Sequence, residues 1–326
     1  MRLRLYGPLP PPFGGISNHI SRLEYYLRAY KIEYKIIDQY KKSKLVLGLS
    51  LSIDILLCRP VHIHIFSKYL LLLVFFLTFY RKQSKVMITI HNDRLIGSRF
   101  YHFIVRKSSF FLIITVSKRS TKYWKLRNEN KVIWLPAFVP PKILNSDTYN
   151  GKIICNVWSY YEGVIDDYGL DMLFKLCCEF PLQKFFLFVG DQACKEEMLS
   201  IIPVFDNLNI LFGKNLVEVF KPHDIFLRLN RVDAFGVSVE EALSCGVYSI
   251  ASNVCIRPKG SYIFDSFENL LHQFNLALKI APHKRYEMVS SAYKKKEYHF
   301  DLIEIYKKLI NQRLNNETSS SEIKRR

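Results

Sequence analysis

Short apolar runs alternate with stretches of helical periodicity along the first half of the chain. Apolar runs typical of buried strands occupy residues 3–6, 34–37, 61–66, 86–91, 111–116 and 132–135. Between the first two runs, Ile16, Ile20, Leu23 and Leu27 recur at helical spacing, which predicts an amphipathic helix over residues 16–30. Strands that are apolar throughout and alternate with helices indicate a parallel sheet covered on both faces.

The same alternation starts again after a polar segment with several prolines, residues 136–151, which predicts a linker. Further strands are predicted at residues 153–158, 185–189, 208–212, 225–229 and 248–251. The pattern therefore predicts an α/β protein with two doubly wound, Rossmann-like domains, residues 1–140 and 151–282, which face each other across a cleft. Residues 283–314 predict C-terminal helices, and residues 315–326 predict a flexible polar tail.

Composition adds a strong basic excess to this picture. The 326 residues are 49% hydrophobic and 23% charged, which is typical of a globular chain, and the formal net charge is +18. Such an excess predicts an anionic partner, either a phosphorylated substrate, an anionic membrane surface or nucleic acid, although a merely soluble basic surface stays an alternative. The sequence carries no helix-turn-helix pattern and no aromatic-rich recognition motif, so we do not expect nucleic acid.

Cysteine content and the apolar runs bear on location. Seven cysteines, an odd number and mostly within apolar runs, predict reduced thiols and a cytoplasmic protein. The N-terminus continues into a proline-rich turn and predicts no signal peptide. The longest apolar run, residues 70–79, is too short to span a bilayer. Residues 68–85 have basic flanks and predict either a buried helix of the sheet or an interfacial helix on an anionic membrane.

The strongest chemical motif is the sequence DAFGVSVEEALSCG at residues 233–246. It follows a predicted strand, and Gly236 opens a helix that Gly246 ends. The N-terminus of such a helix offers free N–H groups and partial positive charge, which bind phosphate. Asp233 lies before the helix and Glu241 within it, so both carboxylates can face one ligand. The alternative is that Asp233 caps the helix and Glu241 is a solvated helix residue.

Two further places at strand ends are candidates for ligand contact. Gly14 and Gly15 lie between the first strand and the first helix, where glycine lets the backbone approach a ligand closely. His91 follows a predicted strand and suits a sugar hydroxyl or a proton relay, although a structural histidine is the alternative. Lys118 has a similar strand-end position, and it is either a phosphate ligand or a surface lysine at a helix start.

The motif at residues 233–241 resembles the acidic signature of the retaining glycosyltransferases of family 4, also known as glycosyl transferases group 1. In that family a Glu, seven residues and a second Glu flank a glycine-opened helix; here the first acid is Asp, as in bacterial surface-polysaccharide members. The sequence ASNVCIRPKG at residues 251–260 resembles a run in the same members. Residues 11–19 resemble the family opening Pro-x-x-Gly-Gly-x-x-x-His, and the resemblance covers about residues 1–300.

The resemblance implies a GT-B fold and a retaining hexosyltransferase-type glycosyltransferase. Its implied substrates are a nucleotide-diphosphate sugar and a lipid-linked or lipopolysaccharide glycan acceptor such as O-antigen, at the inner face of the membrane. No cofactor and no metal are implied. In the family pattern, Glu241 holds the nucleotide ribose and Asp233 holds hydroxyls of the donor sugar. The implied catalytic residues are Asp233, Glu241 and His91, and the implied donor-binding residues are Gly14, Gly15, Phe235, Gly236 and Val237. Arg228 and Lys118 are added as donor-binding candidates from their own positions in the sequence.

The chain departs from the family pattern in one respect. Family members commonly carry an Arg and a Lys, five residues apart, early in the second domain, and residues 159–171 lack this pair. A departing diphosphate still needs positive charge. The candidates to supply it are Arg228, Arg231, Lys214 and Arg257. The departure also leaves open a non-catalytic GT-B-like subunit of a membrane-associated polysaccharide assembly.

Overall fold

The computed structural model describes residues 2–65, 68–79, 84–91, 93, 96–126, 131–141 and 151–311. The chain divides into two compact units, and each is described by itself. The first unit comprises Met1–Leu9, His19–Val139 and Glu297–Arg326. The second unit comprises Pro10–Asn18 and Pro140–Lys296.

A six-stranded parallel sheet forms the centre of the first unit. Its strands are β1 (Leu3–Gly7), β2 (Tyr34–Asp38), β3 (Val61–Ile65), β4 (Val86–Ile90), β5 (Leu112–Thr115) and β6 (Val132–Trp134). The strand order is β2-β1-β3-β4-β5-β6 and every neighbouring pair is parallel. Strand β4 is buried along its whole length, as expected for a strand covered on both faces.

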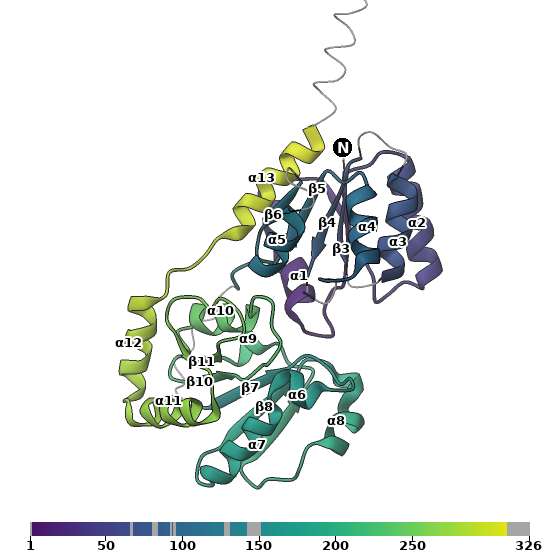
Figure 1. The fold of residues 1–326 in the computed structure, drawn as a ribbon. Helices are drawn as coiled ribbons and strands as arrows, with labels where there is room; N and C mark the ends of the chain where they lie inside the picture. Colours follow the sequence, from purple (N-terminus) through teal and green to yellow (C-terminus); the bar gives the residue numbers. More distant parts are fainter. Residues whose placement is uncertain are drawn as a thin grey trace, which may run out of the picture. The chain divides into compact units, whose positions relative to one another are not determined.

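Helices flank this sheet (Figure 1). They are α1 (Gly15–Ala29), α2 (Lys44–Leu56), α3 (Lys68–Thr78), α4 (Arg99–Lys107), α5 (Lys118–Lys125) and α13 (Tyr298–Asn311). Right-handed crossovers place α1 on one face of the sheet and α2 to α5 on the other. Helix α13 returns to pack beside α1, where the ring centroids of Tyr26 and His299 lie 3.9 Å apart.

The second unit contains a second parallel six-stranded sheet, of order β12-β11-β10-β7-β8-β9. Its strands are β7 (Ile153–Val157), β8 (Phe185–Val189), β9 (Leu208–Phe212), β10 (Ile225–Arg228), β11 (Tyr248–Ser252) and β12 (Ser261–Phe264). The helices are α6 (Val164–Tyr168), α7 (Leu170–Glu179), η2 (Gln192–Cys194), α8 (Lys195–Ile201), α9 (Leu216–Val219), α10 (Val237–Ser244), α11 (Phe267–Lys279) and α12 (Pro282–Ala292). One apolar core fills this unit and includes residues of every strand.

Each sheet has a point at which the direction of winding reverses. In the first unit this point lies between β1 and β3, and in the second unit it lies between β7 and β10. Ligands of doubly wound folds bind beyond the carboxyl ends of the strands at such a point. The carboxyl ends of β7 and β10 therefore mark where a site is expected in the second unit.

The predicted α/β fold with two doubly wound sheets is confirmed. Most strands lie within one or two residues of their predicted bounds, but β12 was not predicted because it is a short, half-exposed edge strand. The region predicted as C-terminal helices contains α12 and α13, separated by a lysine-rich break. Most of the predicted linker, residues 142–150, and the predicted tail, residues 315–326, lie outside the described residues.

The compact units differ from the predicted domain ranges at two places. Pro10–Asn18, in the N-terminal half of the sequence, packs with the second unit. Helix α13 packs with the first unit, because Tyr306 is buried there and its hydroxyl lies 2.7 Å from His62 Nδ1. Within the described residues, no helix has the length and apolar character that crossing a bilayer requires.

Candidate functional site

The helix α10 begins at a glycine, as the sequence predicts. Gly236 has φ 73° and ψ 53°, the left-handed conformation that strains residues with a side chain. A Cβ atom at Gly236 would overlap Nη1 of Arg257 and would lie 3.1 Å from Oδ2 of Asp233. Backbone conformation and space therefore both require glycine here.

Alanine at Gly236 is expected to destabilise the protein more than alanine at Gly163. Gly163 is also left-handed, with φ 90°, but no atom lies within 4 Å of its Cβ position. The strain alone costs about 1–2 kcal/mol of unfolding free energy at either position. At Gly236 the new methyl group also displaces Arg257 from Asp233, so we expect a loss of about 3 kcal/mol or more. Urea unfolding of both variants measures the difference, and equal losses would show that Arg257 does not limit the position.

A buried charge cluster lies beside the N-terminus of α10. Oδ2 of Asp233 accepts hydrogen bonds from Arg228 Nε at 3.0 Å and from Arg257 Nη1 at 2.8 Å. The three side chains are 11%, 10% and 2% exposed for Arg228, Asp233 and Arg257. Burial favours the neutral acid, but the two guanidinium groups outweigh it and lower the pKa of Asp233 to about 2. One carboxylate and two guanidinium groups leave the cluster with a net positive charge.

The two arginines of the cluster differ in their hydrogen bonds and in their solvent exposure. Arg257 also donates to the backbone oxygen and the hydroxyl of Ser252, at 2.9 and 3.1 Å. Arg228 donates to Asn156 Oδ1 at 3.1 Å, and its guanidinium lies 5.7 Å from the ring centroid of Tyr168. Because Arg228 keeps more solvent contact and ends strand β10, it is the better placed of the two to meet a ligand.

Arg231, another predicted source of positive charge, pairs with other carboxylates. Arg231 forms exposed ion pairs with Asp166 at 2.8 Å and with Asp171 at 2.7 Å. Two carboxylates therefore neutralise this guanidinium. Lys214 is exposed on the loop after β9.

Helix α10 carries buried polar side chains in its first two turns. Glu241 is buried, so the alternative of a solvated helix residue is wrong. Gly236, rather than Asp233, occupies the capping position, and no side chain caps the helix. Ser238, on the first turn, is also buried, and within the described residues its hydroxyl has no hydrogen-bond partner.

Ser238 and Asn156 belong to the site but were not predicted as site residues. Each of the two has a sequence feature that points to a site. A hydroxyl at the second position of a glycine-opened helix lies where it can add a donor to an anion site. An asparagine near the end of an otherwise apolar strand is a polar residue at the carboxyl edge of the sheet.

The glycine-rich loop near the N-terminus packs against the second unit, to which it belongs. The backbone N–H of Phe13 donates to the oxygen of Gly190 at 3.1 Å. A Cβ atom at Gly14 would lie only 2.6 Å from the indole of Trp158, and one at Gly15 would lie 3.7 Å from Val237. The fold thus brings the two motifs together, although more than 200 residues separate them.

The remaining predicted site residues, His91 and Lys118, belong to the first unit. His91 follows β4, and its Nε2 shares a 2.7 Å hydrogen bond with Nδ1 of His64. Burial lowers the pKa of His91 to about 3, so the imidazole is neutral. Asn92, next in the sequence, lies outside the described residues.

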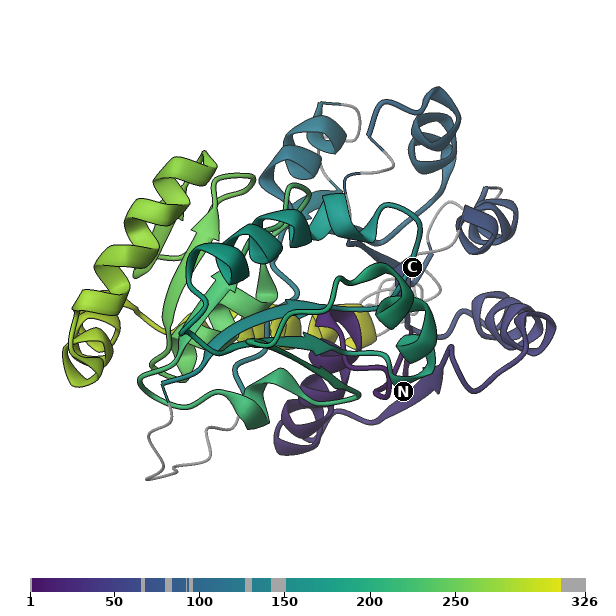
Figure 2. The same cartoon turned by 90° about the horizontal axis from the view of Figure 1, so that it is seen from below.

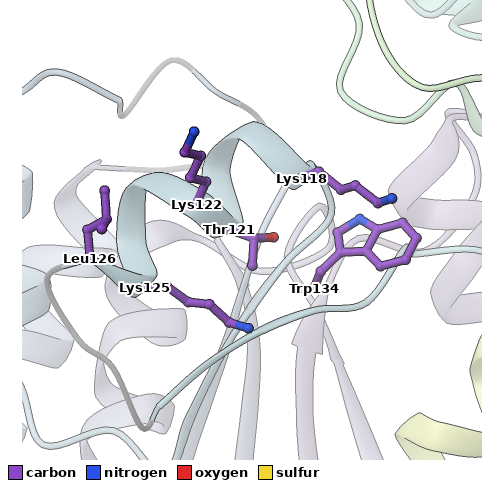
Figure 3. Close-up of a pocket in the computed structure, with 6 residues that line it drawn as sticks. All are labelled: Lys118, Thr121, Lys122, Lys125, Leu126 and Trp134. Carbon is purple, nitrogen blue, oxygen red and sulfur yellow. The ribbon is translucent and has the colours of Figure 1, made fainter.

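Lys118 begins helix α5 and is exposed. Its Nζ lies 4.9 Å from the ring centroid of Trp134. The two side chains line an open pocket of about 420 Å³, shown in Figure 3 with the lysines of α5 around it. The side chain that was predicted to approach phosphate therefore faces a basic, aromatic surface of the first unit.

Two chemical expectations concern metals and thiols. Within the part of the chain that the structure describes, no group of three or more His, Cys, Asp or Glu side chains is placed to hold a metal ion. All seven cysteines lie in the described residues, and none forms a disulfide.

Comparison with known proteins identifies the fold. No family model matches the chain, and no curated protein matches it in sequence. HepE from Anabaena, crystallised with UDP and glucose, is 11% identical over 98% of this chain and 100% of that chain, with a TM-score of 0.66. Sucrose-phosphate synthase from Thermosynechococcus elongatus is 13% identical over 96% and 100%, with a TM-score of 0.67.

A third solved structure is also similar to this chain. WaaG, described as a glycosyltransferase involved in lipopolysaccharide biosynthesis, is 14% identical over 89% of this chain and 94% of that chain, with a TM-score of 0.58. At these identities the similarity establishes the fold. The chain has the GT-B fold, with two parallel sheets and helices interleaved between their strands.

Proposed function

We propose that this chain transfers a sugar from a nucleotide-diphosphate donor to a glycan acceptor. The observation that carries the proposal is the Arg228–Asp233–Arg257 cluster at the glycine-opened start of α10, at the carboxyl edge of the second sheet. A net positive cluster beside a helix N-terminus suits a diphosphate. The fold is shared with HepE, which was crystallised with UDP and glucose.

The geometry supports a division of roles among the residues of the second unit. Backbone N–H groups of Val237 and Ser238, the hydroxyl of Ser238 and the guanidinium of Arg228 would bind the diphosphate. Both arginines bond to Oδ2 of Asp233, which leaves Oδ1 to accept a hydroxyl of the donor sugar. Glu241 would accept the ribose hydroxyls.

These residues would promote departure of the nucleotide diphosphate. As the sugar–oxygen bond breaks, negative charge grows on the leaving phosphate and an oxocarbenium-like sugar forms. The arginine cluster and the helix N-terminus stabilise that charge where it develops. We infer that the acceptor attacks from the face that the diphosphate leaves and passes its proton to a phosphate oxygen, which retains the anomeric configuration. His91 is neutral, so it would bind a sugar hydroxyl rather than act as an acid.

Replacing Arg228 by methionine is expected to lower kcat about 100-fold or more, because it removes positive charge that acts on the leaving group. Asp233 keeps Arg257 as its partner, so the variant should remain folded. Arg231→Met is the matched control, since its guanidinium is exposed and already paired with two carboxylates. Steady-state kinetics of both variants test the role, and similar rates for the two variants would refute it.

We further propose that the acceptor is a lipid-linked or lipopolysaccharide glycan and that the enzyme acts at the inner face of the membrane. The net charge of +18 supports an anionic surface or acceptor. WaaG, with the same fold, is involved in lipopolysaccharide biosynthesis. Incubation with a panel of UDP- and GDP-sugars and a set of glycan acceptors, followed by mass spectrometry of the products, identifies donor and acceptor together. Absence of any product across the panel would count against a transferase.

A non-catalytic GT-B-like subunit is the second candidate. The observation that favours it is at residues 159–171, which lack the family's Arg and Lys pair and instead carry Asp166 and Asp171, which bind Arg231. Calorimetry with the same UDP- and GDP-sugars separates the two candidates. An enzyme binds one of them saturably, whereas a subunit that has lost its donor site binds none.

A further inference from the structure

Helix α2 exposes an apolar side. Leu45, Leu49, Ile53 and Leu56 follow one another at spacings of four, four and three residues, and their exposed fractions range from 52 to 73%. The opposite side of α2 is also mostly apolar and is buried against the first unit. A surface helix ordinarily presents polar residues to solvent, so a helix that is apolar on its outer side is made for contact with something apolar.

Helices α3 and α4 extend this surface. Their exposed side includes Tyr69, Phe76, Phe100 and Phe103. Gly48 of α2 lies against Leu73 of α3, since a Cβ there would be 3.5 Å from Leu73 Cδ2. The ring centroids of Phe75 on α3 and Phe103 on α4 lie 6.0 Å apart. We call these exposed side chains of α2, α3 and α4 the apolar face.

Seen from below, α2 to α5 follow one another along one side of the first sheet, coloured from indigo to blue-teal (Figure 2). Helix α5 joins α4 through His102 and Trp124, whose ring centroids are 6.4 Å apart. Trp124 is buried, whereas Lys118, Lys122 and Lys125 are exposed, so the exposed side of α5 is basic (Figure 3). The helix layer is thus apolar at α2 and α3 and basic at α5, and α4 carries both kinds of side chain.

The part of the sequence that contains these helices is strongly basic. Residues 41–127 contain 17 Lys and Arg but only two carboxylates, Asp54 and Asp93, which gives a net charge of +15 out of +18 for the chain. Asp54 is buried and bonded to Arg59 at 2.6 Å and to Tyr6 at 2.7 Å. Asp93 is half-buried and accepts from Ser117. Within the described residues, no carboxylate on this layer is exposed to offset the basic side chains.

We propose that the apolar face, together with the basic side chains of α4 and α5, docks the first unit on an anionic lipid bilayer. Leucine and phenylalanine side chains enter the boundary between head groups and acyl chains, while lysines and arginines meet lipid phosphates. A second copy of the chain fits less well, because a symmetric contact would place two surfaces of high positive charge against each other. Nucleic acid would match the charge but leaves the apolar side chains of α2 without a partner.

The sequence had left residues 68–85 open between a buried helix and an interfacial helix. Helix α3 has a buried side and an exposed apolar side. Leu71 and Val74 are buried, while Tyr69 and Phe76 are exposed. Residues 80–83, with two of the flanking basic positions, lie outside the described residues. An exposed apolar stripe also lies on α2, which the sequence did not single out.

Flotation with lipid vesicles tests the proposal on the full chain. Phosphatidylcholine vesicles with about one third phosphatidylglycerol should carry the protein to the top of the gradient, whereas pure phosphatidylcholine vesicles should carry little. Added salt should weaken binding, because it screens the basic side chains. Binding to neither kind of vesicle would overturn the proposal.

Two sets of variants separate the apolar and the basic contribution. The apolar set is Leu45→Ser, Leu49→Ser and Ile53→Ser, with Leu182→Ser, Leu199→Ser and Val204→Ser on the second unit as its matched control. The basic set is Lys107→Gln, Lys122→Gln and Lys125→Gln, with Lys184→Gln, Lys195→Gln and Lys279→Gln as its control. The apolar set should reduce partition at least tenfold, and each lysine removed should reduce it roughly fivefold at low salt.

The two controls should bind vesicles as the unchanged protein does. Equal loss in a test set and its control would overturn the proposal, because the effect would then not belong to this surface. Light scattering tests the remaining alternative, which is that a second copy of the chain covers the apolar face. A dimer that the apolar set dissociates, without vesicle binding by the unchanged protein, would assign the face to a second copy and refute the lipid surface. None of these readouts depends on sugar transfer.

Discussion

Glutamine at Glu241 is expected to lower kcat/KM for the nucleotide-sugar donor about 100-fold or more while the protein stays folded. Glu241 is buried within α10, about a turn and a half from Gly236. A carboxylate that accepts from ribose hydroxyls forms charge-assisted bonds worth about 1.5–3 kcal/mol each, and the neutral amide loses most of that. Alanine at the same position should abolish measurable transfer.

A neighbouring residue on α10 supplies the control. Glu240 is equally buried, but its carboxylate accepts from the hydroxyl of Tyr293 at 2.8 Å. Glu240→Gln should therefore lower the melting temperature slightly and leave donor affinity unchanged. Circular dichroism of both variants checks the fold.

A donor that lacks a ribose hydroxyl tests whether Glu241 contacts the ribose. If Glu241 binds the ribose, the unchanged enzyme should lose rate with a 2′- or 3′-deoxy donor, and Glu241→Gln should lose little more with that donor. Fully additive losses would place Glu241 away from the ribose. Transfer at the unchanged rate by Glu241→Gln would remove it from the site altogether.

Acidification from pH 7 to pH 5 is expected to destabilise the first unit strongly. His19, His62 and His64 are buried and His91 is partly buried, and the four rings lie around β3 and β4. Burial, and then neighbouring histidines for the first three of them, lower their pKa values, to about 3 for His19 and His91 and well below 6.5 for His62 and His64. Because the unfolded chain binds protons near pH 6.5 and the folded chain does not, stability is complete above pH 6.5 and falls below it.

The expected loss of unfolding free energy is large. Each histidine whose pKa lies near 3 contributes roughly 1.4 kcal/mol per pH unit below 6.5, so His19 and His91 together contribute about 4 kcal/mol by pH 5, and His62 and His64 add to this loss. That is a large part of the total stability of a typical domain. Urea unfolding at pH 7, 6 and 5 measures the slope. His64→Gln should reduce the number of protons taken up on unfolding by about one.

Exposed histidines of the second unit provide the comparison. His272 and His283 are exposed, so His272→Gln and His283→Gln are the matched controls that leave the buried imidazoles in place. An unfolding free energy that stays constant between pH 7 and pH 5 would show that these four imidazoles are not held neutral in the folded protein.

Much of the fold was predictable because the strands are apolar throughout. Runs such as Phe185–Val189 and Leu208–Phe212 were predicted with their observed bounds. The position of α13 was not predictable, since its attachment depends on a contact between Tyr306 and His62, 244 residues apart. Local periodicity carries no information about such pairs.

The candidate site was predictable where its chemistry is local. Gly236, Asp233 and Glu241 lie within nine residues of one another, so their spacing on a glycine-opened helix was visible in the sequence. The two arginines on Asp233 were predictable only as candidates, because strand β10 supplies one and the loop after β11 supplies the other. The outward leucines of α2 were missed because an apolar helix has the same pattern whether one side or both are buried.

Calorimetric titration with UDP, GDP and the corresponding monophosphates tests the central claim most directly, namely that the arginine cluster at the start of α10 binds a nucleotide diphosphate. We expect one diphosphate to bind saturably and more tightly than its monophosphate, and Arg228→Met, but not Arg231→Met, to remove that preference. A protein that binds neither diphosphate, or an Arg228→Met variant that keeps the full preference, would contradict the account.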